Sequence, residues 1–178
     1  MNLINAEHTR ILAIAPSTRG FGFAVLEGPE TLVDWGVKSV NGDKNTRSLA
    51  KAEDMIVHYQ PGVLVLEDNS AKLSRRSTRI RDLHQNLIAM AASRSVKVSS
   101  FSRDQVRRVF FGKDQGTKHA LAEILAKRFP EELGDRLPRR RRLWMSEDYR
   151  MDIFDAVSLG LTFACSKNRA TPVAASLR

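Results

Sequence analysis

Three acidic residues in this sequence have the side chains and the positions that metal-dependent phosphate chemistry needs. Glu67 ends the apolar run of residues 62–67, and Asp152 and Asp155 lie three apart in a segment with helical periodicity. Residues at this spacing share one helix face, about 5–6 Å apart, and two carboxylates so close repel each other unless a cation lies between them. Mg²⁺ suits that position because it prefers carboxylate oxygens and leaves coordination sites for water and phosphate. The three acids therefore look like most of the carboxylate set of a two-metal nuclease site.

Each of these features also has an ordinary structural explanation. Acid pairs at this spacing are common on solvated helix faces, and an acid that ends an apolar strand is only slightly more telling. The metal hypothesis therefore depends on the order of the three acids and on the elements that bear them. No cluster of Cys and His offers zinc ligands, and no organic cofactor is expected.

The elements that would position the acids form one α/β domain. Apolar patterns and short turns predict an antiparallel meander, and Leu49, Ala52, Ile56 and Tyr59 recur at helical spacing. We expect strands at 11–15, 21–26, 31–40, 63–67 and 97–101, helices at 46–60, 73–94, 102–112, 117–128 and 147–166, and a loop at 130–148. This order predicts a mixed five-stranded sheet flanked by helices, with residues 1–166 as the domain and 167–178 as a flexible basic tail.

The composition favours a folded protein with a polyanionic partner. The chain has 178 residues, 42% of them hydrophobic, which is enough for one domain with a buried core. Its 29 Lys and Arg exceed its 20 Asp and Glu, which gives a net charge of +9. This charge favours nucleic acid as a binding partner, although a soluble basic protein without such a partner can have the same balance. The single cysteine, Cys165, cannot form an internal disulfide, and it predicts a reducing, cytoplasmic compartment. We expect no membrane span and no signal peptide.

Taken together, the motifs resemble those of the RuvC family, Holliday junction resolvases with a ribonuclease-H-like fold. Members open with an apolar strand, an Asp, a Pro and a small-residue turn before a Gly-rich strand, as in ILAIAPSTRGFGFAV at residues 11–25. The family's second acid ends the fourth strand, matching Glu67, and its last motif matches DIFDAVSL at 152–159. A basic stretch with a Gly and a following Lys matches QVRRVFFGKDQGTK at 105–118. The resemblance covers about residues 10–165, with all motifs in order.

The resemblance implies hydrolysis of a DNA phosphodiester by two Mg²⁺ ions, for which Mn²⁺ can substitute. Glu67, Asp152 and Asp155 would be metal ligands, and Lys118 would stabilise charge at the scissile phosphate. Without the resemblance, Lys118 would be a solvated lysine at a helix start. The family acts as a homodimer on branched double-stranded DNA, which implies a cytoplasmic, nucleoid-associated chain, or an organellar one in a eukaryote.

Ala15 departs from the family pattern, because it replaces the first catalytic Asp, which is expected to bridge both metals. Alanine has no oxygen ligand, so cleavage should be abolished or strongly reduced. One explanation is an engineered change from Asp made to trap an uncut DNA complex, which the other intact motifs favour. The second is a natural pseudonuclease that binds branched DNA without cutting it. The stretch from Glu131 to Asp148 is also longer and more basic than is usual in the family.

Three basic groups lie next to the acid-bearing segments. A charge run is usually a solvated face, but three groups in these places favour phosphate contacts around a cleft. The groups are Lys72, Arg75, Arg76, Arg79 and Arg81; Arg103, Arg107, Arg108, Lys113 and Lys118; and residues 139–142. The candidate DNA-binding residues among them are Arg75, Arg76, Arg79, Arg107, Lys113 and Lys118.

Two apolar features have both a structural and a functional explanation. Ile80, Leu83, Leu87 and Met90 recur at helical spacing and could form half of a dimer interface or part of the core. The pair at 110–111 could wedge against bases, although such a pair is more often core.

Three functions remain open from the sequence. The leading hypothesis is a metal-dependent endonuclease for branched DNA that is impaired at Ala15. The second is a structure-specific DNA-binding protein, and restoring a carboxylate with Ala15→Asp separates these two. The third is a ribonuclease-H-like enzyme acting on RNA–DNA hybrids, which competition between substrates would reveal.

Overall fold

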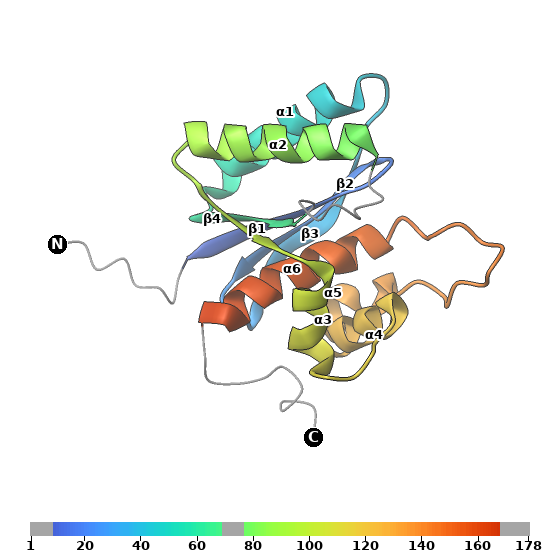
Figure 1. Cartoon of the computed structure of the whole chain (residues 1–178). Helices are drawn as coiled ribbons and strands as arrows, with labels where there is room; N and C mark the ends of the chain where they lie inside the picture. Colours follow the sequence, from blue (N-terminus) through green and yellow to red (C-terminus); the bar gives the residue numbers. More distant parts are fainter. Residues whose placement is uncertain (1–8, 69–76, 168–178) are drawn as a thin grey trace.

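The computed structural model describes residues 9–68 and 77–167, which form a layered α/β domain (Figure 1). A five-stranded mixed sheet has the order β3-β2-β1-β4-β5. Helices α1 and α2 cover one face of this sheet, and α6 lies against the other with α3 and α4 outside it (Figure 1). The elements are β1 (Arg10–Pro16), β2 (Gly20–Glu27), β3 (Thr31–Ser39), α1 (Lys44–Tyr59), β4 (Val63–Glu67), α2 (Thr78–Ser93), β5 (Lys97–Phe101), α3 (Arg103–Phe111), α4 (Lys118–Arg128) and α6 (Met151–Lys167).

The sheet has the mixed topology that the sequence predicted. Strands β1, β2 and β3 form an antiparallel meander, and β4 and β5 continue the sheet in parallel beside β1. The parallel strands need helical crossovers, which α1 and α2 supply. The predicted α/β fold, a five-stranded mixed sheet flanked by helices, is thus confirmed.

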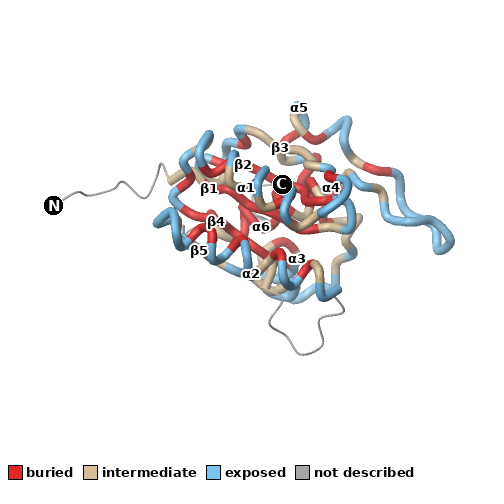
Figure 2. Tube along the Cα trace, turned by 90° about the horizontal axis from the view of Figure 1, so that it is seen from above, coloured by how far each residue is buried: buried red, intermediate tan, exposed pale blue. Residues whose placement is uncertain are grey.

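The pleat of β1 divides its side chains between two cores. Leu12 and Ile14 pack in the core under α1 and α2. Ala13 and Ala15 point to the opposite face and pack in the core under α3, α4 and α6. Because neighbouring side chains of a strand alternate between faces, the continuous apolar run of β1 marks a strand covered on both sides. Figure 2 shows the sheet and the inner faces of the helices as the buried centre of the domain.

Short polar side chains fix where several helices begin. A capping box of Ser102 and Gln105 is present at the start of α3. The hydroxyl of Thr117 accepts the amide of Ala120 at the start of α4. These caps satisfy amides that have no partner inside the helix, so the side chains at the first helical positions are held in place.

The predicted start of α2 near residue 73 was wrong. Ser77 has an extended backbone and its hydroxyl accepts the amide of Ile80, so the helix begins at Thr78. Residues 69–76, which include part of the predicted helix, lie outside the described residues.

Two predictions near the C-terminal end also differ from the structure. The segment 130–148 is not all loop, because Pro130 opens the short helix α5 (Pro130–Leu133), followed by the 3-10 turn η2 (Gly134–Arg136). Helix α6 begins at Met151 rather than near 147, since the Asp148 carboxylate accepts the amide of Arg150 in a turn just before it. The tail at 168–178 lies outside the described residues.

The apolar stripe of α2 is part of the core. Ile80, Leu83, Leu87 and Met90 are buried within the chain, so the stripe does not offer a dimer interface. Phe110 is also buried, which makes the phenylalanine pair a core feature. None of the helices in the described parts of the chain has the length and apolar character needed to cross a membrane.

Candidate functional site

The sheet brings Ala15 and Glu67 to the same face. In β4, Val65 points toward α6 and Leu66 toward α1 and α2, so alternation directs Glu67 toward α6. Strand β1 runs parallel to β4 with Ile14 opposite Leu66, and the next pair of positions is therefore Ala15 and Glu67. The two residues end neighbouring strands at one edge of the sheet, beneath α6.

Gly22 lets the start of α6 come close to this edge. It is paired with Ala15 across β1 and β2. A Cβ atom at Gly22 would lie 2.0 Å from the carbonyl oxygen of Asp152, which is far inside contact distance. Only a glycine allows the strand and the helix to approach so closely, and the approach places Asp152 beside Ala15.

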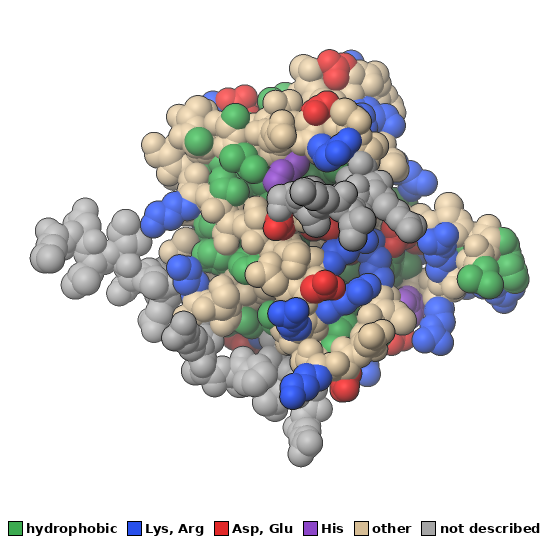
Figure 3. All heavy atoms as spheres, viewed as in Figure 1, with side chains coloured by type: hydrophobic (Ala, Val, Ile, Leu, Met, Phe, Trp, Pro, Cys, Tyr) green, Lys and Arg blue, Asp and Glu red, His purple; other side chains and the backbone are tan. Residues whose placement is uncertain are grey.

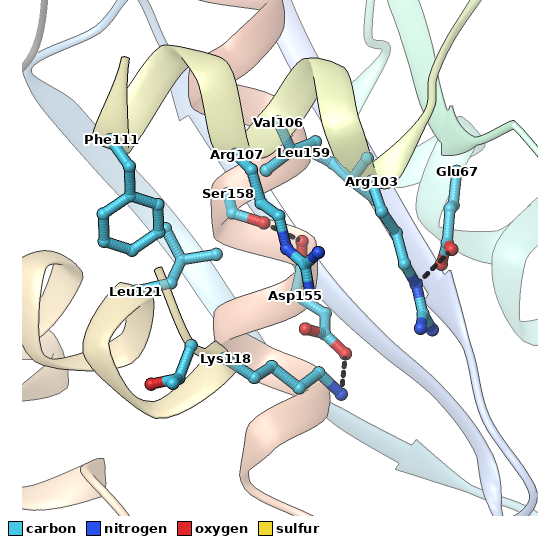
Figure 4. A pocket seen from close by; sticks show the side chains of 11 residues that line it. Glu67, Arg103, Val106, Arg107, Phe111, Lys118, Leu121, Asp155, Ser158 and Leu159 are labelled. Carbon is cyan, nitrogen blue, oxygen red and sulfur yellow. Dashed lines mark hydrogen bonds and ion pairs between the residues drawn. The ribbon is translucent and has the colours of Figure 1, made fainter. Parts of the chain in front are cut away.

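Glu67 is paired with an arginine from the neighbouring element. The Nε atom of Arg103 lies 2.7 Å from Oε1 of Glu67 (Figure 4). The Glu67 side chain is 16% exposed, so its charge lies close to the protein interior. Burial alone would lower the pKa of Arg103, but the charge and the hydrogen bond of Glu67, with the charges of Asp155 and Glu147, together outweigh burial and raise that pKa. The guanidinium therefore neutralises the acid that was predicted to bind metal.

Asp155 is paired with Lys118 in the same way. The Nζ atom of Lys118 lies 2.7 Å from Oδ2 of Asp155 and 2.8 Å from Oε1 of Glu147 (Figure 4 shows the first pair). Burial alone would lower the pKa of Lys118, but the charges of Asp155 and Glu147 outweigh burial and raise it. Lys118 is thus held as a cation between two carboxylates.

Asp152 has a raised tendency to hold a proton. Burial, with a smaller contribution from the charge of Asp155, raises its pKa to about 6 against a hydrogen bond from Ser17 that lowers it. The hydroxyl of Ser17 comes from the turn after β1, so Asp152 is bonded to the segment that follows Ala15.

The described residues do not fit a two-metal centre. The side chain at position 15 supplies no oxygen, and Glu67 and Asp155 each already pair with a cationic side chain. Within residues 9–68 and 77–167, no three His, Cys, Asp or Glu side chains come together as a metal-holding group. The structure brings the predicted acids to one region, but Glu67 and Asp155 lie there as members of ion pairs.

The site opens into a pocket and an adjoining groove that carry positive charge. The pocket has a volume of about 100 Å³, and Glu67, Arg103, Arg107, Lys118 and Asp155 are among the residues that line it (Figure 4). Arg107 and Lys118 also line the groove, which continues along the end of α3 past Arg108 and Lys113. Three of the predicted DNA-binding residues, Arg107, Lys113 and Lys118, therefore share one continuous surface.

The other predicted DNA-binding residues have different surroundings. The Arg79 guanidinium donates to the carbonyl oxygen of Ser17 at 2.7 Å and to Oδ1 of Asn45 at 3.2 Å. These bonds tie α2 to α1 and to the turn after β1, so Arg79 holds the fold together beside the site. Arg75 and Arg76 lie outside the described residues.

No role in the site was predicted for Arg103, Glu147 or Ser17. Arg103 was counted only as a basic surface residue, although it comes two residues after Phe101, which pairs with Glu67 between β5 and β4. A correct strand register would have placed Arg103 beside Glu67. Glu147 lies in a stretch without periodic pattern, so no local signal marked it as a partner of Lys118.

Comparison with solved structures identifies the fold as that of RuvC and related resolvases, which is ribonuclease-H-like. Thermus thermophilus RuvC matches with a TM-score of 0.65 at 15% identity, over 90% of this chain and 97% of that one. The same protein in complex with a Holliday junction substrate matches with a TM-score of 0.68 at 16% identity, over 91% and 96%. The yeast mitochondrial Holliday junction resolvase matches with a TM-score of 0.57 at 14% identity, over 88% and 78%. No protein-family model and no curated protein matches the sequence.

Proposed function

We propose that this chain binds branched DNA through a nuclease fold whose phosphodiester hydrolysis is impaired at position 15. The proposal rests on the missing carboxylate at position 15 and on the ion pairs of Glu67 and Asp155. Ala15 has no side-chain oxygen, while Arg103 and Lys118 lie against Glu67 and Asp155, where a nuclease of this design would hold metal. A site closed in this way keeps its cations for phosphate, but it has no carboxylate at position 15, and Glu67 and Asp155 are ion-paired.

The basic surface beside the site supports DNA as the ligand. Arg107, Lys113 and Lys118 line one groove that leads from the paired acids, and the whole chain has a net charge of +9. Contacts of Arg and Lys to phosphates give affinity for any DNA, and their arrangement gives preference for a shape. We propose the Holliday junction as the DNA that has this shape, because a solved protein of this fold is in complex with one.

Nuclease activity is proposed for the chain with a carboxylate at position 15. In that form Mg²⁺, or Mn²⁺ in its place, is the expected cofactor, with Glu67, Asp152 and Asp155 as the further ligands. The ion pairs of the present site would compete with the metal, so recovery is expected to be incomplete from Ala15→Asp alone. A homodimer that presents two such sites to paired strands, in the cytoplasm or an organelle, belongs to the same proposal.

A binding and cleavage assay tests the proposed function. A labelled four-way junction, a linear duplex of equal length and an RNA–DNA hybrid are each titrated with the unaltered chain, with Mg²⁺ present. We expect tighter binding to the junction than to the other two ligands, without nicks. Equal binding to junction and duplex would remove the structure-specific function, and preference for the hybrid would replace it with a ribonuclease-H-like one.

The variant Arg107→Ala with Lys113→Ala identifies the surface that binds. Both side chains line the groove and neither forms an ion pair with the described residues, so the fold should be unaffected. Because each lost phosphate contact lowers the salt slope by about 0.9, the slope should fall by roughly 2. The matched control is Arg47→Ala with Lys51→Ala, which removes two exposed charges from α1 on the other side of the sheet.

A further inference from the structure

An exposed arm projects from the domain between η2 and α6. Every residue from 139 to 147 is exposed, and Figure 1 shows this segment, here called the arm, extending away from the layered body. It begins with four arginines, Arg139, Arg140, Arg141 and Arg142. Such a long exposed stretch contributes little to the core, so its composition calls for an explanation in terms of binding.

The outer end of the arm is apolar and is shaped by a turn. The amide of Met145 donates to the carbonyl oxygen of Arg142 at 3.0 Å, which places Leu143 and Trp144 at the two corners of the turn. Leu143 is 99% exposed, Trp144 is 76% exposed, and Met145 is exposed as well. Single exposed apolar residues are ordinary, but three in a row that include a tryptophan indicate a surface that is covered by a partner.

The arm is also strongly cationic. Among the described residues, no acid forms an ion pair with the four arginines. The guanidinium of Arg142 lies 5.7 Å from the ring centroid of Trp144, so one cation is beside the aromatic face. Figure 3 shows hydrophobic side chains at the far end of the arm with Lys and Arg side chains close by. An aromatic tip flanked by unpaired cations matches the chemistry of nucleic acid, which offers base faces next to phosphates.

The base of the arm is attached to the candidate site. Glu147 at its end accepts from Lys118, which in turn holds Asp155. Two residues on, the Tyr149 ring lies 6.0 Å from the guanidinium of Arg19 in the turn between β1 and β2. A ligand that contacts the base of the arm therefore also lies next to the groove lined by Arg107 and Lys118.

We propose that the Leu143–Trp144 tip binds unstacked bases of branched DNA beside the site, while the arginines of the arm contact the adjacent phosphates. The proposal rests on the proposed function and adds to it a contact that distinguishes branched from linear DNA. The base pairs inside a linear duplex are stacked on both sides, whereas those that flank an open branch point lack a stacking neighbour on one side. Phosphate contacts cannot make this distinction alone, since both DNA forms carry the same charge per strand.

The test uses the fluorescence of Trp144 and the affinity of a tip variant. The chain has two tryptophans, Trp35 and Trp144, so Trp35→Phe leaves Trp144 as the only fluorescent tryptophan. We expect a four-way junction, but not a duplex, to lower the emission of Trp144. The junction should also protect the Trp144 ring from collisional quenching by acrylamide. Leu143→Ala with Trp144→Ala should weaken junction binding by about tenfold, with duplex affinity and the salt slope unchanged, because no charge is removed. Val57→Ala, at an exposed apolar residue of α1, is the matched control.

The possible outcomes separate the tip from the proposed function. If the unaltered chain shows no preference for the junction, both proposals fail. If it prefers the junction and the tip variant does so equally well, only the tip proposal is overturned. A tip variant that binds DNA normally but changes in sedimentation would assign the tip to contacts between copies of the chain, and would also overturn the proposal. Equal thermal melting of all variants shows that the fold is preserved.

Discussion

The candidate site and the arm handle positive charge in opposite ways. In the site, Arg103 and Lys118 each lie against a carboxylate, on elements whose ends are fixed by caps and by the sheet. In the arm, four arginines precede an apolar tip, and none of them is ion-paired within the described residues. The arm should therefore contribute more to phosphate binding than the site, because a cation that is already paired binds phosphate less strongly than an exposed one.

The candidate site and the arm also differ in how far the elements that bear them are buried. The site rests on β1, β4 and α6, which are buried, whereas the arm is exposed throughout. Substitutions in the site should therefore alter stability, and substitutions in the arm should alter binding alone. The following experiments test this contrast, from the largest expected effect to the smallest.

The largest effect is expected from Gly22→Ala. The new Cβ would lie 2.0 Å from the carbonyl oxygen of Asp152, so α6 must shift away from β2. Overpacking of this kind costs about 1–3 kcal/mol or more, since the clash is with backbone. The midpoint of urea unfolding measures the loss. Leu143→Ala in the arm is the comparison and should change the free energy of unfolding by less than about 0.5 kcal/mol. Equal losses in the two variants would contradict the claim that the site, and not the arm, affects stability.

The next effect concerns the charges of the arm. Arg139→Ala with Arg140→Ala should weaken binding to any DNA by about tenfold or more and lower the salt slope by roughly 2. Fluorescence anisotropy over a series of salt concentrations measures both. The charge-matched variant Arg47→Ala with Lys51→Ala should have a smaller effect on both quantities. If the two variants behave alike, the arm contributes only to net charge.

A smaller effect is expected when Arg103 is removed from Glu67. In the Ala15→Asp background, Arg103→Ala should increase the affinity for Mn²⁺ by about tenfold, because a charge-assisted hydrogen bond no longer competes for the carboxylate. Titration followed by the electron paramagnetic resonance of free Mn²⁺ gives the dissociation constants. Arg107→Ala in the same background is the control. Equal Mn²⁺ binding with and without Arg103 would show that the ion pair does not close the site.

The smallest effect concerns the protonation of Asp152. Its folded pKa is raised to about 6, mainly by burial, from the ordinary value of 3.8. A raised carboxyl pKa means that the folded state binds the proton more tightly, so the associated stability is present below about pH 4 and is lost as the pH rises through 6. Relative to Asp152→Asn, the unaltered chain should therefore lose about 1–2 kcal/mol across this window, after allowance for solvent screening.

Urea unfolding of both proteins at several pH values measures the difference. A constant difference between pH 4 and pH 7 would contradict the raised pKa. Asp82→Asn, at an exposed position of α2, is the control and should show no such trend.

The sequence predicted the sheet well because its strands are buried and continuous. The apolar runs at β1 and β4 and the turns of the meander identify the strands without tertiary information. The placement of Glu67 near α6 could also be predicted, since a strand-end acid must project beyond the sheet. The pairing of Glu67 with Arg103 could not, because it depends on the register between β4 and β5 and on the cap at Ser102.

The arm was the least predictable region. Residues 139–147 have no hydrophobic period, so their form depends on two hydrogen bonds within the turn and on Glu147 reaching Lys118. The start of α2 was missed for a related reason, because Ser77 can lie within a helix or cap it, and only the fold decides.

Junction cleavage by the unaltered chain beside Ala15→Asp is the most direct test of the central claim, that this fold binds branched DNA while its own side chains and Ala15 disable the chemistry. A labelled four-way junction is incubated with each protein and Mg²⁺, and bound and nicked products are mapped. We expect the unaltered chain to bind the junction and leave it intact, with paired, symmetric nicks arising only from Ala15→Asp. Nicks made by the unaltered chain, or a failure of both proteins to prefer the junction over duplex, would contradict the account.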